Sequence, residues 1–204
     1  MTGINPADFI RRWQGSPWRR FGTAWELTQA APAVIEARIG ELGEAFVIED
    51  RIAVHRSAQV ETGAILKPPV IIGPECFVAT GAYLRGGVWL ERSCIIGPAC
   101  EAKTSFLFSG SKIAHLSFCG DSVIGEDANV EAGAMIANYR NEWSDKVIRI
   151  RTADGIIETG VDKFGVLCGD GARIGANAVI APGALIPPGG IIGRGSLIDQ
   201  GAQA

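Results

Sequence analysis

Residues 70–100 read VIIGPECFVATGAYLRGGVWLERSCIIGPAC, and an aliphatic side chain recurs in this stretch at every sixth position. The same period extends in both directions along the chain. One uninterrupted run comprises Val54, Val60, Leu66, Ile72, Val78, Leu84, Leu90 and Ile96, and a later one comprises Cys168, Ile174, Ile180, Ile186, Ile192 and Ile198. Between the two runs the step slips, with Ala102, Leu107, Ile113, Cys119, Ile124, Val130 and Ile136 at intervals of five or six.

A period of six fits neither a helix, which needs about 3.6, nor a half-buried strand, which needs two. It fits a coil of three short strands, each pointing one aliphatic side chain into a narrow interior. Gly or Pro commonly follows the aliphatic position, as in IIGPEC at 71–76, and glycine accepts the positive φ of a tight corner without steric cost. The pattern predicts an all-β solenoid, a left-handed parallel β-helix of hexapeptide repeats. A β-sandwich is the alternative, and two long runs at one period argue against it.

The composition excludes several other classes of protein. The chain has 204 residues, enough for one large domain, and a net charge of −3, so no basic field favours nucleic acid or an anionic membrane. No apolar run has the length of a signal peptide or a membrane span. The five cysteines are dispersed without a CxxC pair, which predicts reduced, buried thiols in a cytoplasmic protein.

Residues 1–45 interrupt the period and are predicted to form a helical segment before the β-helix of 46–204. Asn5-Pro6 has the pattern of an N-cap, Thr23 to Glu26 has the spacing of a capping box, and Pro32 is expected to separate two short helices. Three tryptophans in this segment are expected to cover the open end of the solenoid: Trp13, Trp18 and Trp25. The basic pairs Arg11-Arg12 and Arg19-Arg20 are interpreted as a solvated helix face.

Residues from about 138 to 165 form the second interruption. The stretch VIRIRTADGIIETG at 147–160 predicts two strands around an Asp-Gly turn. A loop of this length that leaves a regular solenoid is usually functional.

The residues with chemical potential gather between Arg85 and Lys146. Arg85 and Lys103 follow inward positions on nearby coils, so stacking places two cations on one wall, suited to a phosphate or diphosphate. Glu101 could orient an imidazole or hold a substrate ammonium, and His115 is the natural general base. Further hydrogen-bonding groups follow one and two coils later: Asn129, Asn138 and Tyr139.

Each of these residues also has a purely structural interpretation. A histidine among apolar residues is more often structural than catalytic, the two cations could be ordinary surface charges, and Asn138 suits a turn. The joint spacing favours a site over any single assignment. The second histidine, His55, is read as a surface residue.

Residues 101–139, EAKTSFLFSGSKIAHLSFCGDSVIGEDANVEAGAMIANY, resemble the acetyltransferase domain of the bifunctional glucosamine-1-phosphate acetyltransferase/N-acetylglucosamine-1-phosphate uridylyltransferases. They are closer to the archaeal sugar-1-phosphate nucleotidylyltransferases that carry a C-terminal acetyltransferase β-helix. The family pattern runs E-x-K, then HLSY-GDS, then N-x-GAGT-x-x-AN. KFGVLCGDGARIGANAVIAPG at 163–183 is also similar to the archaeal proteins, and the resemblance extends over about 45–200.

The resemblance implies roles for individual residues. It makes His115 the catalytic base, Glu101 its acidic neighbour, and Arg85 and Lys103 the ligands of the acceptor phosphate. Substrate contacts fall on Asn129, Asn138, Tyr139 and Phe118, and a loop lysine that reaches a neighbouring subunit is most nearly matched by Lys146. The resemblance also implies a homotrimer, with acetyl-CoA in grooves between β-helices and beside Ala132 and Gly133, and no metal.

Three features depart from the family. Phe118 replaces a tyrosine, so one hydroxyl near the substrate is missing. Residues 131–134, Glu-Ala-Gly-Ala, replace GAGT and bring a carboxylate to the region expected to accept acetyl-CoA. The nucleotidylyltransferase domain has no counterpart in this sequence.

The predicted function is transfer of an acetyl group from acetyl-CoA to the amine of an amino-sugar phosphate or nucleotide amino sugar. A β-helix metalloenzyme of the carbonic anhydrase type needs three histidines, and this chain has two. The remaining alternative is a non-catalytic β-helix that binds sugar nucleotides or assembles with a separate nucleotidylyltransferase. Phe118 and Glu131 favour that alternative, whereas the retained Arg85, Lys103 and His115 favour catalysis.

Overall fold

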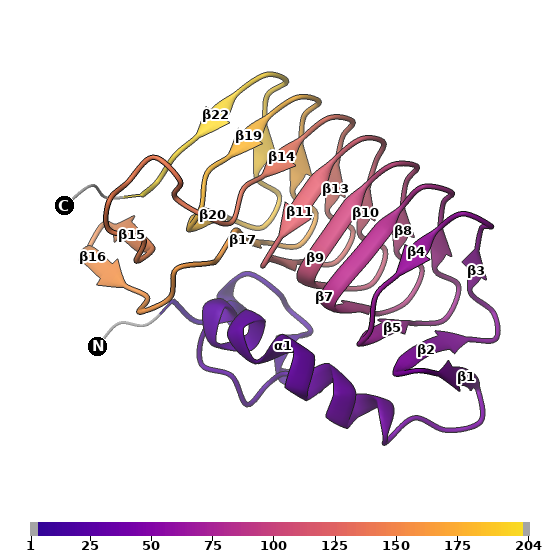
Figure 1. Cartoon of the computed structure of the whole chain (residues 1–204). Coiled ribbons are helices and arrows are strands. Elements are labelled where there is room, and N and C mark those ends of the chain that lie inside the picture. Colours follow the sequence, from indigo (N-terminus) through magenta and orange to yellow (C-terminus); the bar gives the residue numbers. More distant parts are fainter. Residues whose placement is uncertain (1–3, 202–204) are drawn as a thin grey trace.

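Short strands stack coil upon coil into a parallel β-helix, and a helical N-terminal segment runs along its side (Figure 1). The computed structural model describes residues 4–201. Each coil turns through three faces, which we number in the order used below. The predicted fold class, a parallel β-helix with an N-terminal helical segment and one protruding hairpin, is confirmed.

The strands divide among the faces as follows. The first face holds β4 (Ile65–Leu66), the starts of β7 (Tyr83–Leu90) and β9 (Glu101–Leu107), β11 (Phe118–Gly120), β14 (Met135–Ile136), β19 (Val179–Ile180) and β22 (Leu197–Ile198). The second face holds β3 (Gln59–Val60), β6 (Phe77–Val78), β8 (Ile95–Ile96), β10 (Lys112–Ile113), β13 (Asn129–Val130), β18 (Arg173–Ile174) and β21 (Ile191–Ile192). The third face holds β2 (Ile52–His55), β5 (Val70–Ile72), the ends of β7 and β9, β12 (Val123–Ile124), β17 (Val166–Cys168) and β20 (Ala184–Ile186).

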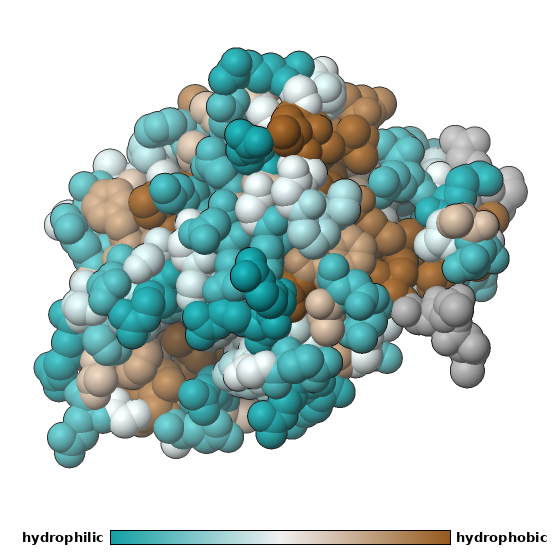
Figure 2. All heavy atoms as spheres, turned by 180° about the vertical axis from the view of Figure 1, so that it is seen from behind, coloured by the Kyte–Doolittle hydropathy of each residue, from teal (hydrophilic) through white to brown (hydrophobic). Residues whose placement is uncertain are grey.

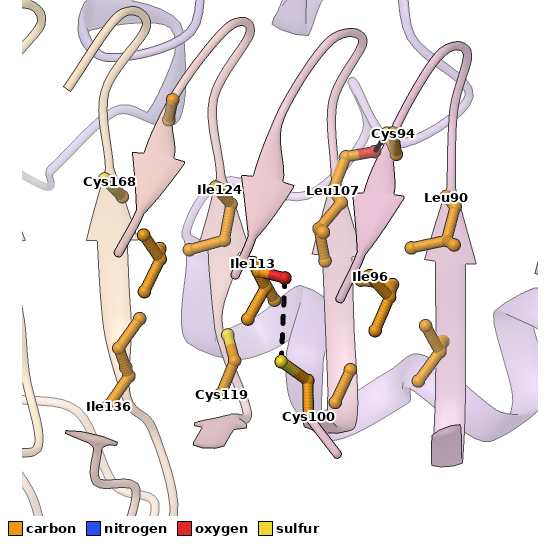
Figure 3. Close-up of a cluster of buried hydrophobic side chains, with 14 of the residues drawn as sticks. Leu90, Cys94, Ile96, Cys100, Leu107, Ile113, Cys119, Ile124, Ile136 and Cys168 are labelled. Atoms are coloured by element: carbon orange, nitrogen blue, oxygen red, sulfur yellow. Dashed lines mark hydrogen bonds between the residues drawn. The ribbon is translucent and has the colours of Figure 1, made fainter. Parts of the chain in front are cut away.

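The periodic aliphatic residues fill the interior as predicted. Leu90, Leu107, Ile124 and Cys168 lie in register on successive coils, and Figure 3 shows them as one column of the core. All four are fully buried. The interior is narrow, so one side chain per strand fills it and the next residue on either side points outward.

The two five-residue steps of the sequence have one structural cause. Both fall at the corner where a coil passes from the first face to the third, between Ala102 and Leu107 and between Cys119 and Ile124. The preceding coil turns this corner with Gly86-Gly87, whereas the next two turn it with one residue each, Thr104 (φ 51°) and Asp121 (φ 46°). The excursion of 138–165 leaves the solenoid at the same corner one coil later.

The N-terminal segment contains two 3₁₀ turns (Pro6–Asp8 and Trp13–Gly15) and one helix, α1 (Ala24–Ile39). The predicted capping box is present, because Thr23 accepts from the Glu26 amide and the Glu26 carboxylate accepts from the Thr23 amide. The expected break at Pro32 is wrong: α1 continues through it. Its exposed ring leaves the buried stripe of Leu27, Ala31 and Ile35 free to pack on the solenoid.

The expectation that the tryptophans cover an open end of the solenoid is also wrong. α1 contacts β5, β7 and β9, and Trp18 packs edge-on against Trp89 and Phe106, with ring centroids 5.4 Å and 5.1 Å apart. The third face presents large apolar residues outward, among them Ile71, Trp89 and Phe106, and the helical segment buries them. The coil at the N-terminal end is instead edged by β1 (Phe46–Glu49), which pairs antiparallel with β2.

The excursion contains the predicted hairpin. Strands β15 (Arg149–Thr152) and β16 (Gly155–Glu158) pair antiparallel around Ala153-Asp154, beside the C-terminal coil. Seen from behind, the surface of the molecule is mostly hydrophilic, with several separate apolar areas (Figure 2).

Candidate functional site

Five of the eleven predicted site residues lie at or beside the corner between the first and third faces. Arg85 and Lys103 are in register on β7 and β9, so the predicted stacking of two cations on one wall is observed. The Arg85 guanidinium lies 2.6 Å from Glu101 Oε1, and Lys103 Nζ lies 2.6 Å from Asp121 Oδ2. Each cation therefore has its own carboxylate.

Asp121 is the central residue that the sequence reasoning missed. Its carboxylate also accepts a hydrogen bond from the Asn138 amide, and its carbonyl accepts one from the Gly165 amide at 2.9 Å. It thereby joins Lys103 to both ends of the excursion, and it is only 3% exposed. The five-residue step from Cys119 to Ile124 marks this position, because a shortened corner forces a non-glycine residue to positive φ.

Phe118 and Asn138 meet over Gly120. A Cβ at Gly120 would lie 2.8 Å from the Phe118 ring and 2.8 Å from Asn138 Cγ, so this position tolerates no side chain. Phe118 is in register with Glu101 on the neighbouring coil. The structure thus brings together five predicted residues: Arg85, Glu101, Lys103, Phe118 and Asn138.

His115 lies at a different corner, where the chain passes from the second face to the first. Its side chain is exposed, and within residues 4–201 the imidazole has no hydrogen bond or ion pair. The expected contact with Glu101 is absent from a single copy of the chain. The His115 carbonyl accepts from the Gly133 amide at 2.9 Å, so the Ala132-Gly133 corner stacks directly on the His115 corner.

Asn129 is on the second face, apart from the Arg85 cluster. It lines a groove of about 260 Å³ with Glu131, Arg173 and Arg194. Arg194 binds both oxygens of Glu131 at 3.0 Å, and this guanidinium holds the pKa of the Glu131 carboxyl below its ordinary value. The carboxylate that distinguishes residues 131–134 from GAGT is therefore neutralised within the chain.

A buried arginine fixes the excursion next to Asn138. Arg140 is 1% exposed and binds both oxygens of Asp199, at 2.8 Å and 2.6 Å, and the Pro182 carbonyl at 2.9 Å. Tyr139, which precedes it, remains exposed. The Lys146 ammonium donates to the carbonyls of Arg140, Asn141 and Trp143, so in this structure it binds its own loop.

A cavity of about 610 Å³ is lined by none of the predicted residues. It lies between the first 3₁₀ turn and the corner from the third face to the second, and carboxylates line it, among them Glu126 and Asp170. Burial and the neighbouring Asp170 raise the pKa of Glu126.

His55, which was predicted to be a surface residue, is half-buried, and the centroid of its ring lies 5.0 Å from that of Phe46.

Three further properties of the described residues complete the description of the structure. No helix in the described range 4–201 is long and apolar enough to cross a membrane. Within the same range, no three His, Cys, Asp or Glu side chains are grouped to hold a metal ion. The five cysteines are free and buried, as predicted.

Comparison of the whole sequence with those of known proteins identifies relatives. A bifunctional sugar-1-phosphate nucleotidylyltransferase/acetyltransferase from Sulfurisphaera tokodaii is 33% identical over 164 residues, covering 80% of this chain and 40% of that protein. The chain is similar to the bifunctional nucleotidylyltransferase/acetyltransferases. A bifunctional protein GlmU from Methanocaldococcus jannaschii is 28% identical over 162 residues, covering 78% of this chain and 39% of that protein. The resemblance stated for residues 101–139 is confirmed, and the chain spans about two fifths of the length of these two relatives.

No protein-family model matches the chain. Among solved structures, a perosamine N-acetyltransferase from Caulobacter crescentus in complex with CoA and GDP-perosamine is 14% identical. The structural match covers 71% of the present chain and 51% of the perosamine N-acetyltransferase chain, with a TM-score of 0.41.

Proposed function

We propose that the protein is an acetyl-CoA-dependent N-acetyltransferase whose acceptor is an amino-sugar phosphate or a nucleotide amino sugar. The observation that carries the proposal is the cluster of Arg85, Glu101, Lys103 and Asn138 at one corner of a β-helix. The resemblance to the acetyltransferase family assigns acceptor-site roles to these same residues, which supports the proposal. The sequence identity to bifunctional enzymes named for acetyl transfer supports the same chemistry.

This cluster suits an acceptor that carries a negatively charged phosphate and a positively charged ammonium group. Arg85 and Lys103 are donors for a phosphate, and Glu101 and Asp121 are acceptors for hydroxyl or ammonium groups of a sugar. Because each cation is already paired with a carboxylate, it is held in position before the acceptor binds. Positioning of this kind lowers the entropic cost of bringing two substrates together.

Acetyl-CoA supplies an activated acyl group, and His115 supplies the base. The imidazole takes a proton from the acceptor ammonium, and the freed amine attacks the thioester carbonyl carbon. A C–N bond forms as the C–S bond breaks, and the CoA thiolate leaves and is protonated. No cysteine is needed as a nucleophile, which suits five buried thiols.

We infer that the site is completed by a second copy of the chain, in a homotrimer. His115 projects into solvent from its corner, Asn129 lies on the second face, and the polar cluster flanks the first face on the side away from His115. Packing of one copy's exposed corner against another copy's first face would bring these groups together. The small side chains of Ala132-Gly133 and the groove with Arg173 leave room there for acetyl-CoA and its phosphates.

The non-catalytic alternative keeps one supporting feature. Glu131 no longer favours it, since Arg194 neutralises that carboxylate. Phe118 still does, because the hydroxyl of the relatives is absent.

The test is an acetyl-transfer assay. The protein is incubated with acetyl-CoA and a panel of amino-sugar phosphates and nucleotide amino sugars, and CoA thiol release and the acetylated product are measured. We expect transfer to at least one acceptor, and a loss of about 100-fold or more in His115→Ala. No release above background with any acceptor would overturn the enzyme assignment, and full activity of His115→Ala would overturn the role of His115.

A further inference from the structure

Arg85 and Lys103 point outward in register on successive coils, and Lys67 occupies the corresponding position one coil before Arg85. We call this row of three residues the cation ladder. The Lys67 amide donates to the Leu84 carbonyl at 2.8 Å, which continues the parallel register of Ile65 with Tyr83 and Leu66 with Leu84. Leu66 faces the core, so its neighbour Lys67 points outward on the same side as Arg85. The spacing between neighbouring strands places the backbones of Lys67 and Arg85 about 4.8 Å apart. Lys103 lies one strand beyond Arg85.

The charges on this ladder do not balance. Arg85 is paired with Glu101 and Lys103 with Asp121. Lys67 is exposed, and no carboxylate of residues 4–201 forms an ion pair with it. Among the cations of this ladder in residues 4–201, Lys67 is therefore the one without a carboxylate, and its ammonium can accept an anion without breaking an existing pair.

The adjacent outward ladder at the same coils is apolar and aromatic. Ile65 is 49% exposed, and Tyr83 lies beside it with the Arg85 guanidinium 5.8 Å from its ring centroid. Aromatic rings and guanidinium groups are the surfaces on which nucleobases stack. An anion-binding pair of cations thus borders a surface suited to a nucleoside.

We propose that Lys67, Arg85 and Tyr83 form a subsite for a nucleoside diphosphate. The two phosphates would bridge Lys67 and Arg85, and the nucleoside would lie over Tyr83 and Ile65. The inference rests on the proposed function and narrows it: the acceptor is a nucleotide amino sugar, with the sugar directed toward Glu101 and Asp121. A sugar monophosphate would leave Lys67 without a partner.

The test measures binding by calorimetry, without catalysis. The probes are UDP, GDP, dTDP and inorganic phosphate, and the proteins are the wild type, Lys67→Gln, Lys67→Arg and Lys163→Gln. We expect at least one nucleoside diphosphate to bind more tightly than phosphate and to lose about tenfold in affinity in Lys67→Gln. Lys67→Arg keeps the charge and Lys163→Gln removes an exposed lysine elsewhere, so both should bind as the wild type does.

Two results would overturn the subsite: no diphosphate binds better than phosphate, or Lys67→Gln binds the diphosphate as the wild type does. The acetyl-transfer assay separates this failure from failure of the proposed function. Transfer to a nucleotide amino sugar that is insensitive to Lys67→Gln would remove the subsite and keep the enzyme. Lys67-dependent diphosphate binding without any acetyl transfer would remove the enzyme and keep the subsite.

Discussion

Lys103 Nζ lies 2.6 Å from Asp121 Oδ2, and this contact joins two coils of the solenoid at the corner from which the excursion departs. The side chains are 17% and 5% exposed, so water screens the pair weakly. Asp121 also accepts from the Asn138 amide. The pair therefore serves both the stability of the corner and the position of Asn138.

Asp121→Ala tests the structural part of this role. Removing one partner leaves the Lys103 ammonium buried without its counter-charge, which costs about 3–5 kcal/mol in comparable pairs. We expect the free energy of unfolding in urea to fall by about 3 kcal/mol. The matched control is Glu41→Ala, which breaks the exposed Arg38–Glu41 pair and should change stability by at most about 1 kcal/mol.

A second variant identifies the cause of that loss. Adding Lys103→Met to Asp121→Ala removes the unpaired charge, so the double variant should be more stable than Asp121→Ala alone. Equal losses in Asp121→Ala and Glu41→Ala would contradict a buried, structurally important pair.

Phe118→Tyr introduces the hydroxyl that the family pattern HLSY-GDS has at this position. The Phe118 ring meets Asn138 over Gly120, so a hydroxyl at Cζ would extend into the polar cluster. One added hydrogen bond to the acceptor should lower KM by about 3- to 10-fold, with kcat little changed. The control is Phe77→Tyr, an outward aromatic residue on the second face. An unchanged KM would mean that the acceptor differs from that of the relatives at the group this hydroxyl contacts.

The period of the sequence predicts the β-helix because the interior admits one aliphatic side chain per strand, as at Leu90 and Leu107. The sequence does not predict where the N-terminal segment packs, because its tryptophans indicate an apolar surface without distinguishing the end of the solenoid from its third face. The missing information lies elsewhere in the chain. Trp89 and Phe106 stand immediately before inward residues, where an outward side chain should be polar, and they mark the third face as covered.

The candidate site was predictable in part for a similar reason. Arg85 and Lys103 are found by counting coils, because parallel register carries sequence spacing directly into space. Asp121 was missed because its importance arises from a shortened corner, which appears in the sequence only as a slip of the period. His115 lies at a different corner of its coil and its side chain is exposed, so spacing within one chain predicts no contact between it and the cluster.

The buried thiols should be inert in the folded protein. Burial raises the pKa of Cys119 and of Cys168 to about 12, so almost no thiolate exists at pH 8. We expect no reaction with Ellman's reagent in buffer, and release of five equivalents in guanidinium. Rapid native labelling of Cys119 or Cys168 would contradict the core as described.

Pro32→Ala should stabilise the protein. Pro32 lies in the interior of α1 and has no amide hydrogen for the helical bond to the Thr28 carbonyl, and an interior proline costs about 3 kcal/mol relative to alanine. The proline ring is exposed, so its loss leaves no cavity. We expect the free energy of unfolding to rise by about 1–3 kcal/mol.

The control for this prediction is Ala33→Gly, at the next exposed position of α1, which should lower stability by about 1 kcal/mol. A decrease in stability for Pro32→Ala would have a specific meaning. A Cβ at Gly87 would lie 3.0 Å from both the Ala31 carbonyl carbon and the Pro32 nitrogen, so the α1 backbone passes close to β7 at this point. Destabilisation by alanine would show that the local helix geometry set by proline is what permits this approach, and that the packing of α1 on the third face depends on it.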